Sequence, residues 1–290
     1  IMKILVLGID GMIGHKIAQS LANDFIIVGS TRKKINNQDI GIKKCNLVTH
    51  DFIKDNTLNL LDNIKPNIII NCVGVTIRRG INTNKNNTEL LNSKLPHKLN
   101  EWVEKNQKKL IHFSSDCVFS GEKGNYFDNS TPDADDIYGL SKSHGEVKSN
   151  NTLTIRCSII GREIFNHTEL FEWLYSMKNK KIEGYKNVIY SGVTSTWMGK
   201  TINHIIKNKI ELNGIYNISS IPISKYDLLV KLSDIFNLNV DISLNSNIKS
   251  NKVLISKKFT EITGINSPNW SDLIVDFKAD SDKFSTIYKS

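Results

Sequence analysis

The chain has 290 residues, of which 39% are hydrophobic and 23% are charged, and its formal net charge is +9. This length suffices for one large α/β domain, or for a nucleotide-binding domain joined to a smaller one. No run of eighteen apolar residues occurs, so we expect no transmembrane helix and no membrane partner. The lysines form no basic block, so we expect a small anionic ligand rather than nucleic acid.

Strand and helix patterns alternate through the first half of the chain. Apolar residues at helical spacing predict helices over 13–21 and 90–105. Apolar, β-branched runs predict strands at residues 3–7, 25–28, 67–72, 109–113 and 152–155. Strands that alternate with helical crossovers form a parallel sheet. The sequence therefore predicts an α/β protein with a Rossmann-type doubly wound parallel sheet and a small C-terminal substrate-binding part.

A glycine turn follows the first predicted strand and opens the first predicted helix. Gly8 permits the tight turn, Gly11 lets the backbone approach a pyrophosphate, and Gly14 lets helix and strand pack closely. Met12 and Ile13 complete the turn, where the helix start offers N–H groups and a partial positive charge to phosphates. Glycines in this strand, turn and helix context predict a dinucleotide site.

The second predicted strand ends without an acidic residue, in the sequence Gly29-Ser30-Thr31-Arg32. A carboxylate there would bind the ribose hydroxyl of NAD, whereas hydroxyls and an arginine suit a 2′-phosphate. Thr31 and Arg32 therefore favour NADPH as the cofactor, with NADH as the alternative. The alternative is that Arg32 is a solvated loop residue that does not contact the cofactor.

The pattern changes after about residue 160. Helical and extended segments follow at residues 169–177, 188–194, 198–208, 214–219 and 224–236. We expect residues 2–160 to form an NAD(P)-binding Rossmann domain. Residues 161–290 should form mainly a substrate-binding part, with 210–236 returning to the Rossmann domain.

Tyr138 and Lys142 stand four residues apart and so share one face of a predicted helix. An ammonium group nearby and the cationic oxidised nicotinamide stabilise the phenolate, so we expect the pKa of Tyr138 to fall from its ordinary value near ~10. Tyr138 can then protonate a carbonyl oxygen as hydride arrives at its carbon. Ser115, just after a predicted strand, can orient that carbonyl. With the glycine turn, these three residues predict a carbonyl reductase.

Four widely spaced cysteines, Cys45, Cys72, Cys117 and Cys157, form no CxxC pair, and the seven histidines show no metal-ligand spacing. The sequence therefore predicts neither a disulfide framework nor a metal site. Reduced thiols, together with the absence of a basic-then-apolar leader before the first strand, indicate a cytoplasmic protein.

Much of the chain, from residue 2 to about residue 230, resembles the dTDP-4-dehydrorhamnose reductase-like extended short-chain reductases. The matching segments are residues 8–14, 70–74, 114–121, 138–142, 156–161, 214–219 and 222–227. The resemblance implies NAD(P)H-dependent reduction of the 4-keto group of a nucleotide-linked 6-deoxy hexos-4-ulose. The nucleotide would be UDP or dTDP, and a 2-acetamido-2,6-dideoxy sugar is one form of this substrate.

The resemblance also assigns roles to single residues. Ser115, Tyr138 and Lys142 match the catalytic positions, and Asn46 and Leu47 fall near the place where relatives have an aspartate beside the adenine. The matching cofactor positions are Cys72, Val73, Gly74, Tyr138 and Lys142. The implied substrate contacts are Thr76, Ser115, Cys117, Val118, Phe119 and Tyr138.

Cys117 departs from the tyrosine that non-epimerising rhamnose reductases usually carry. The similar GDP-fucose and UDP-rhamnose synthases have a cysteine there that acts as an acid/base beside the 4-keto sugar. The resemblance therefore leaves open a coupled C3 epimerisation, in which His167, or Glu172 as second choice, acts on the opposite face. The structural alternative is that Cys117 is a small buried hydrophobe.

A different class of function is open within the same fold. The β subunit of methionine adenosyltransferase shares this fold and family, and such a non-catalytic NADP-binding regulatory subunit can lose the catalytic residues. Ser115, Tyr138 and Lys142 are all present here, which favours the enzyme. The sequence leaves a homo-oligomer open.

Overall fold

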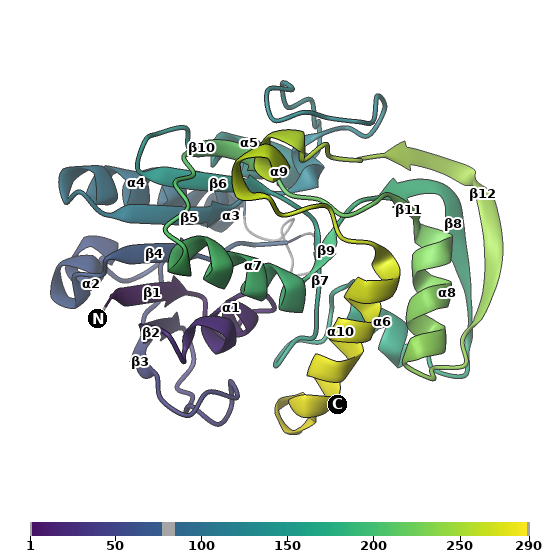
Figure 1. Ribbon diagram of the computed structural model, residues 1–290, viewed down its shortest axis with the longest axis horizontal. Helices are drawn as coiled ribbons and strands as arrows, with labels where there is room; N and C mark the ends of the chain where they lie inside the picture. The colour runs from purple at the N-terminus through teal and green to yellow at the C-terminus, as the bar shows by residue number, and fades with distance from the viewer. Residues whose placement is uncertain (1, 77–84, 289–290) are drawn as a thin grey trace.

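Seven parallel strands form the central sheet of the computed structural model, which describes residues 2–76 and 85–288 (Figure 1). Their order across the sheet is β10-β6-β5-β4-β1-β2-β3. The strands are β1 (Lys3–Leu7), β2 (Ile26–Thr31), β3 (Asn46–Thr49), β4 (Ile68–Asn71), β5 (Lys109–Phe113), β6 (Thr152–Arg156) and β10 (Gly214–Asn217). Every neighbouring pair is parallel, so the predicted Rossmann-type sheet is confirmed.

The strand order reverses between β1 and β4. From β1 the chain continues to β2 and β3 on one side, whereas from β4 it continues to β5 and β6 on the other. Connections that leave the sheet in opposite directions open a crevice at its carboxyl edge. The ends of β1, β4 and β5 meet at this edge, since Leu7 pairs with Asn71 and Asn71 pairs with His112.

One face of the sheet is covered by α1 (Gly14–Leu21) and by α7 (Ser195–Lys207). Side chains alternate between the two faces of a strand, and Ile4 and Val6 point to this one. They share a buried core with Ile202 of α7. A helix from the second half of the chain therefore completes the domain that the first half begins.

The opposite face is covered by α2 (Thr57–Ile64) and α4 (Leu95–Lys105), whose apolar sides pack against Leu5 and Leu7. A short helix, α3 (Lys85–Thr88), and a π-helical turn at Glu89–Lys94 precede α4. The predicted helix 90–105 is therefore not one continuous α-helix. The helix α5 (Ile137–His144) packs against the π-helical turn.

A smaller part lies beside the sheet and has its own core (Figure 1). Its sheet has the order β11-β8-β12, in which β8 pairs parallel with β12 and antiparallel with β11. The core contains Phe171, Leu228 and Phe277 from three different helices. Its elements are α6 (Leu170–Ser176), β8 (Lys181–Tyr190), β11 (Ile223–Ser224), α8 (Lys225–Ile235), β12 (Asp241–Asn251) and α10 (Trp270–Lys283).

The two parts exchange segments. A two-stranded pair, β7 (Ile159–Ile160) and β9 (Val193–Thr194), joins them, and α9 (Lys257–Thr263) packs near β10. Of the segment 210–236, β10 lies in the central sheet, whereas α8 lies in the smaller part. Within the described residues, we find no helix with both the length and the apolar character to span a membrane.

Candidate active site

The glycine turn between β1 and α1 has the geometry that a phosphate-binding turn requires. Gly8 has a φ of +72°, a left-handed conformation that favours glycine. A Cβ on Gly14 would lie 2.1 Å from the Gly8 carbonyl oxygen, so a larger residue would push the helix off the strand. The Gly11 amide donates to the same Gly8 oxygen at 3.0 Å and closes the turn.

A cavity of about 740 Å³ extends from this turn across the ends of β2 and β4. The predicted cofactor residues that line it are Gly8, Gly11, Thr31, Arg32, Cys72, Val73 and Gly74. A second cavity of about 360 Å³ shares Gly11 and residues 72–75 with the first, and Met12 and Ile13 line it. The two cavities thus form one long crevice, which suits an extended ligand such as a dinucleotide.

Asn46 and Leu47 line neither cavity, so the structure does not bring them to the crevice, and their place beside the adenine stays a prediction. Both stand at the start of β3, whereas ligands bind at the carboxyl ends of parallel strands. Asp51 and the two residues after it, which follow the end of β3, line the larger cavity instead. The Asp51 carboxylate accepts a hydrogen bond from the Ile53 amide at 2.9 Å. Sequence reasoning missed Asp51 because it did not predict β3.

The smaller cavity brings the predicted catalytic residues together, since Ser115, Cys117, Tyr138 and Lys142 all line it. The Ser115 Oγ accepts from the Cys117 amide at 3.1 Å. The Lys142 Nζ donates to the Phe113 carbonyl at 2.6 Å and so ties α5 to the end of β5.

Gly139 lets α5 approach the loop that carries Cys117. A Cβ on Gly139 would lie 2.3 Å from the Cys117 carbonyl oxygen, too close for any larger residue. Asp136 caps the helix, because its carboxylate accepts from the Gly139 amide at 2.9 Å. Helix start and loop are thereby fixed together, and Tyr138 between them faces the cavity.

Burial governs the protonation of the catalytic groups. It raises the pKa of Tyr138; the charge of Asp116 raises it further, and a hydrogen bond with Ser115 partly offsets these effects. Among the protein side chains desolvation thus outweighs the ammonium group, and the lowering by a bound nicotinamide cation stays a prediction. Burial also lowers the pKa of Lys142 to about 8 and raises that of Cys117 to about 12. At neutral pH, Tyr138 and Cys117 are therefore proton donors.

The two residues predicted to work opposite Cys117 do not line its cavity. The His167 Nδ1 lies 3.4 Å from a Glu172 carboxylate oxygen. Glu172 is buried and forms an ion pair with Arg162 at 2.7 Å, so its carboxylate points into the interior of the smaller part. The structure does not bring His167 or Glu172 to the catalytic residues.

Glu169 lines the catalytic cavity instead. It occupies the N-cap position of α6, yet its side chain does not cap the helix. Its carboxylate accepts from the Thr76 Oγ1 at 2.8 Å and so connects the start of α6 with the loop that follows β4. Lys225, the first residue of α8, lines the same cavity. The sequence carries no signal for either residue, because both reach the site only through packing of the smaller part.

Two of the predicted substrate contacts, Val118 and Phe119, do not line this cavity. Val118 and Phe119 are fully buried and pack with Tyr126 and Leu254 below the loop, with the Phe119 and Tyr126 rings stacked at 4.0 Å. Their side chains therefore cannot contact a ligand in the crevice. Thr76, in contrast, lines the catalytic cavity.

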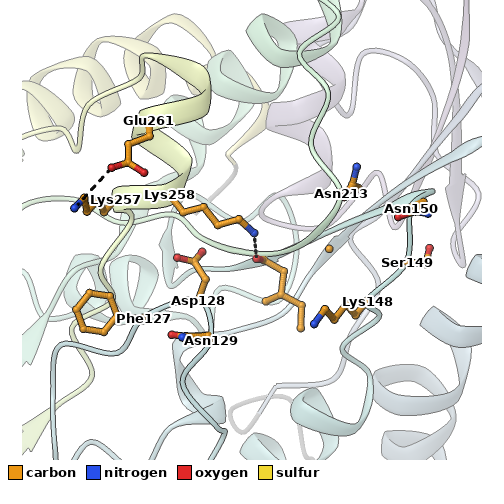
Figure 2. A pocket seen from close by; sticks show the side chains of 12 residues that line it. Phe127, Asp128, Asn129, Lys148, Ser149, Asn150, Asn213, Lys257, Lys258 and Glu261 are labelled. Carbon is orange, nitrogen blue, oxygen red and sulfur yellow. Dashed lines mark hydrogen bonds and ion pairs between the residues drawn. The ribbon is translucent and has the colours of Figure 1, made fainter.

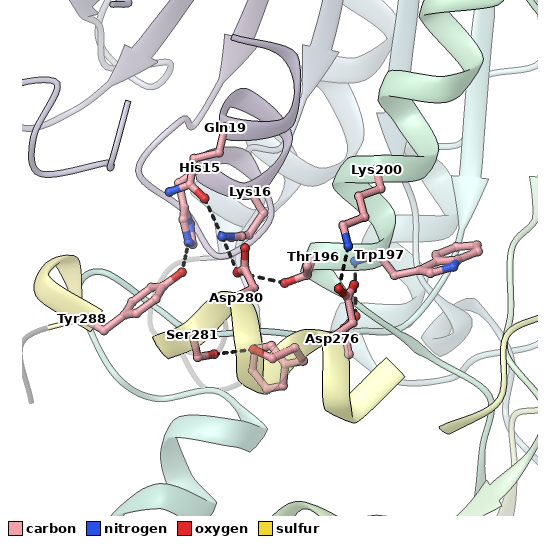
Figure 3. A network of polar contacts seen from close by, with 12 residues as sticks. His15, Lys16, Gln19, Thr196, Trp197, Lys200, Asp276, Asp280, Ser281 and Tyr288 are labelled. Carbon is pink, nitrogen blue, oxygen red and sulfur yellow. Dashed lines mark hydrogen bonds and ion pairs between the residues drawn. The ribbon is translucent and has the colours of Figure 1, made fainter. Parts of the chain in front are cut away.

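A buried polar network connects the glycine turn with the end of the chain (Figure 3). His15 contacts the Gly11 carbonyl through Nδ1 at 2.8 Å and the Tyr288 hydroxyl through Nε2 at 2.9 Å. Beside them, Lys16 forms an ion pair with Asp280 of α10 at 2.5 Å. α1, which begins at the phosphate-binding turn, is thus fastened to the C-terminal segment at two points.

A separate cavity of about 870 Å³ lies at the β10 edge of the sheet (Figure 2). Lysines and acidic residues line it, and the Lys257 Nζ lies 3.7 Å from the Glu261 carboxylate. The Lys258 Nζ is 3.5 Å from the Ile215 carbonyl oxygen. None of the predicted catalytic residues lines this cavity, so we place the active site in the crevice above β1, β4 and β5.

Comparison with known proteins agrees with this geometry. The chain is 25% identical over 243 residues to a dTDP-4-dehydrorhamnose reductase from Aggregatibacter actinomycetemcomitans, covering 80% of this chain and 78% of that protein. It is 23% identical over 266 residues to methionine adenosyltransferase 2 subunit beta from Danio rerio, covering 81% and 74%. The fold matches that of a Bacillus anthracis dTDP-4-dehydrorhamnose reductase solved with NADP, with a TM-score of 0.74, 18% identity and coverage of 97% and 100%.

The family model for the RmlD substrate binding domain matches residues 2–168, more than half of the chain. The matched region contains the glycine turn, Ser115, Tyr138 and Lys142. The chain therefore belongs to the RmlD family of extended short-chain reductases.

Proposed function

We propose that this protein reduces the 4-keto group of a UDP- or dTDP-linked 6-deoxy hexos-4-ulose, with NADPH as the preferred hydride donor and NADH as the alternative. The observation that carries the proposal is the single crevice that joins the glycine turn to Ser115, Tyr138 and Lys142. The similarity to a dTDP-4-dehydrorhamnose reductase supports it independently.

The residues of the crevice fit NADPH. Gly8 and Gly11 leave the backbone open to a pyrophosphate, and Thr31, Arg32 and Lys33 line the far end, where a 2′-phosphate would lie. The reduced nicotinamide, when bound, would supply the hydride. The protein's task is then to orient the ketone and to deliver one proton.

Tyr138 is suited to deliver this proton. Burial keeps its phenol protonated at neutral pH, so the O–H can donate to the ketone oxygen as negative charge develops there. The Ser115 hydroxyl can give that oxygen a second hydrogen bond. Lys142, which is cationic below about pH 8, stabilises the phenolate that remains.

Tyr138→Phe tests this assignment. The variant should lose NADPH oxidation with a UDP- or dTDP-linked 4-keto-6-deoxyhexose and should bind NADPH nearly as the wild type does, because only the proton donor is removed. Turnover by the variant near the wild-type rate would refute the mechanism. Tight NADPH binding by a wild type that oxidises it with neither substrate would instead favour the regulatory role, which the similarity to methionine adenosyltransferase 2 subunit beta supports.

We also propose that C3 epimerisation precedes reduction, with Glu169 in place of His167 as the partner of Cys117. A carboxylate accepts protons and a neutral buried thiol donates them, so the two groups have complementary protonation states. Glu169 would take the C3 proton, and the electron pair would move to O4 as an enolate held by Tyr138 and Ser115. The thiol would then return a proton to the other face, and both groups would exchange protons with water.

Deuterium exchange tests the epimerisation without the reduction. In D₂O with NADP⁺ and no reductant, the wild type should place deuterium at C3 of the 4-keto sugar. Glu169→Gln should abolish this exchange, whereas Cys117→Ser should keep exchange but lose inversion. Wild-type reduction without any exchange would leave a plain reductase, and undiminished exchange in Glu169→Gln would exclude Glu169 as the base.

A further inference from the structure

We infer that Tyr288, near the end of the chain, is a positioning residue for the cofactor pyrophosphate. It acts through His15, which holds the Gly11–Met12 peptide in the orientation that phosphate binding requires. The inference rests on the proposed function only in assuming that the crevice binds a dinucleotide. It gives Tyr288 a role in the crevice although Tyr288 lines neither of its two cavities.

The hydrogen-bond chemistry fixes the direction of every contact in this chain of residues. A carbonyl oxygen can only accept, so the His15 Nδ1 must carry the proton that points to Gly11. A neutral imidazole has one donor and one acceptor, and the ring is fully buried and neutral. The His15 Nε2 therefore accepts, and the Tyr288 hydroxyl donates to it.

The Gly11 carbonyl determines where the next amide points. The peptide bond is planar and trans, so the Gly11 C=O and the Met12 N–H point in opposite directions. Because His15 holds the carbonyl on the side of α1, the Met12 amide is directed away from His15. Gly11 and Met12 both line the catalytic cavity, where the N–H groups at the start of α1 are available to an anion.

Two groups of His15 hold this peptide. The Gly11 carbonyl accepts from the His15 amide at 3.2 Å and lies 2.8 Å from the His15 Nδ1. Because glycine has wide backbone freedom, the shorter side-chain contact adds restraint to the longer backbone hydrogen bond. The N-cap residue Ile13 supplies no side-chain hydrogen bond to α1. The His15 imidazole is thus the side chain that holds the turn from the helix side.

Tyr288 is itself held in place. Its ring lies 4.8 Å from the Arg162 guanidinium, and Arg162 is paired with Glu172 in the smaller part. Tyr288 also packs in the same core as Ile17 of α1. The hydroxyl is therefore presented to His15 by a ring with little freedom to move (Figure 3).

Tyr288→Phe removes only the hydroxyl and leaves the ring. The Kd for NADPH, measured by fluorescence titration, should rise about tenfold, which corresponds to about 1.4 kcal/mol. The Kd for 2′-AMP, which lacks the pyrophosphate, should not change, and kcat at saturating NADPH should stay close to the wild-type value. A general loosening of the fold would weaken both ligands.

Asp280→Asn is the matched control, because it breaks the other buried link between α1 and the C-terminal segment, the ion pair with Lys16. It should lower the melting temperature without changing the Kd for NADPH. His15→Phe offers a second variant; it should weaken NADPH as Tyr288→Phe does, and the double variant should be no weaker than either single one.

The outcomes separate this inference from the proposed function. An NADPH Kd that is unchanged in both Tyr288→Phe and His15→Phe would overturn the inference and leave the reductase intact. Equal weakening of NADPH and 2′-AMP would also overturn it. A wild type that binds no NADPH would overturn both.

Discussion

Lys142→Met tests whether the buried ammonium group of Lys142 lowers the stability of the fold. Burial lowers the pKa of Lys142 from its ordinary 10.5 to about 8. At 1.36 kcal/mol per pKa unit, placing the ammonium in this site costs roughly 3 kcal/mol of folding free energy at neutral pH. Because the folded pKa is the lower one, this cost is full below about pH 8 and is relieved as the pH rises towards 10.5.

Urea unfolding of the wild type and of Lys142→Met, at about pH 7.5 and about pH 9.5, measures how much of this free-energy cost disappears as the pH rises. Between these two values the unfolding free energy of the wild type should rise by roughly 2 kcal/mol relative to that of the variant. The variant also loses the bond to the Phe113 carbonyl, but this loss is the same at both pH values and cancels. A difference between the two proteins that does not depend on pH would refute the reasoning.

Three further substitutions probe the crevice and its support. Arg32→Ala should weaken NADPH by roughly tenfold and leave NADH unchanged, because one charge-assisted contact to the 2′-phosphate is lost; equal losses in fluorescence titrations would contradict that contact. Gly14→Ala should lower the melting temperature and prevent NADPH binding, since its Cβ would lie 2.1 Å from the Gly8 oxygen, and calorimetric titration of any soluble protein checks this. Glu146→Ala should cost roughly 3–5 kcal/mol in urea unfolding, because the buried Arg156 loses two contacts of 2.7 Å; a loss below about 1 kcal/mol would show that the pair adds little.

The sequence was sufficient for the parts of the site that depend on local patterns. The spacing of Gly8 and Gly14 predicts a turn between strand and helix, and the positive φ of Gly8 and the close approach of Gly14 to the Gly8 carbonyl agree with it. Tyr138 and Lys142 follow from helical periodicity, and Ser115 from its place after an apolar strand. Each of these inferences needs only a few neighbouring residues in the chain.

The remaining site residues depend on tertiary packing, which no local pattern encodes. Glu169 reaches the cavity because α6 packs in the smaller part, and Tyr288 reaches His15 across more than 270 residues of chain. The upward shift of the Tyr138 pKa by the protein side chains escaped prediction for the same reason, because burial depends on tertiary packing. β12 also escaped prediction, since most of its residues are exposed and only pairing with β8 makes it a strand.

The chain passes from the central sheet into the smaller part and then returns to the sheet, and this order limits how the fold can be modified. β10 and α7 follow α6 and β8 in sequence, yet both belong to the central domain. β10 is the edge strand of the central sheet, and α7 packs over Ile4 and Val6 on one of its faces. A fragment that ended near residue 160 would lack that edge strand and would expose an apolar face to water. The smaller part therefore cannot be exchanged for another by splicing at one junction. Such an exchange would have to replace each segment that leaves the central sheet and returns to it, while the sheet itself keeps its sequence.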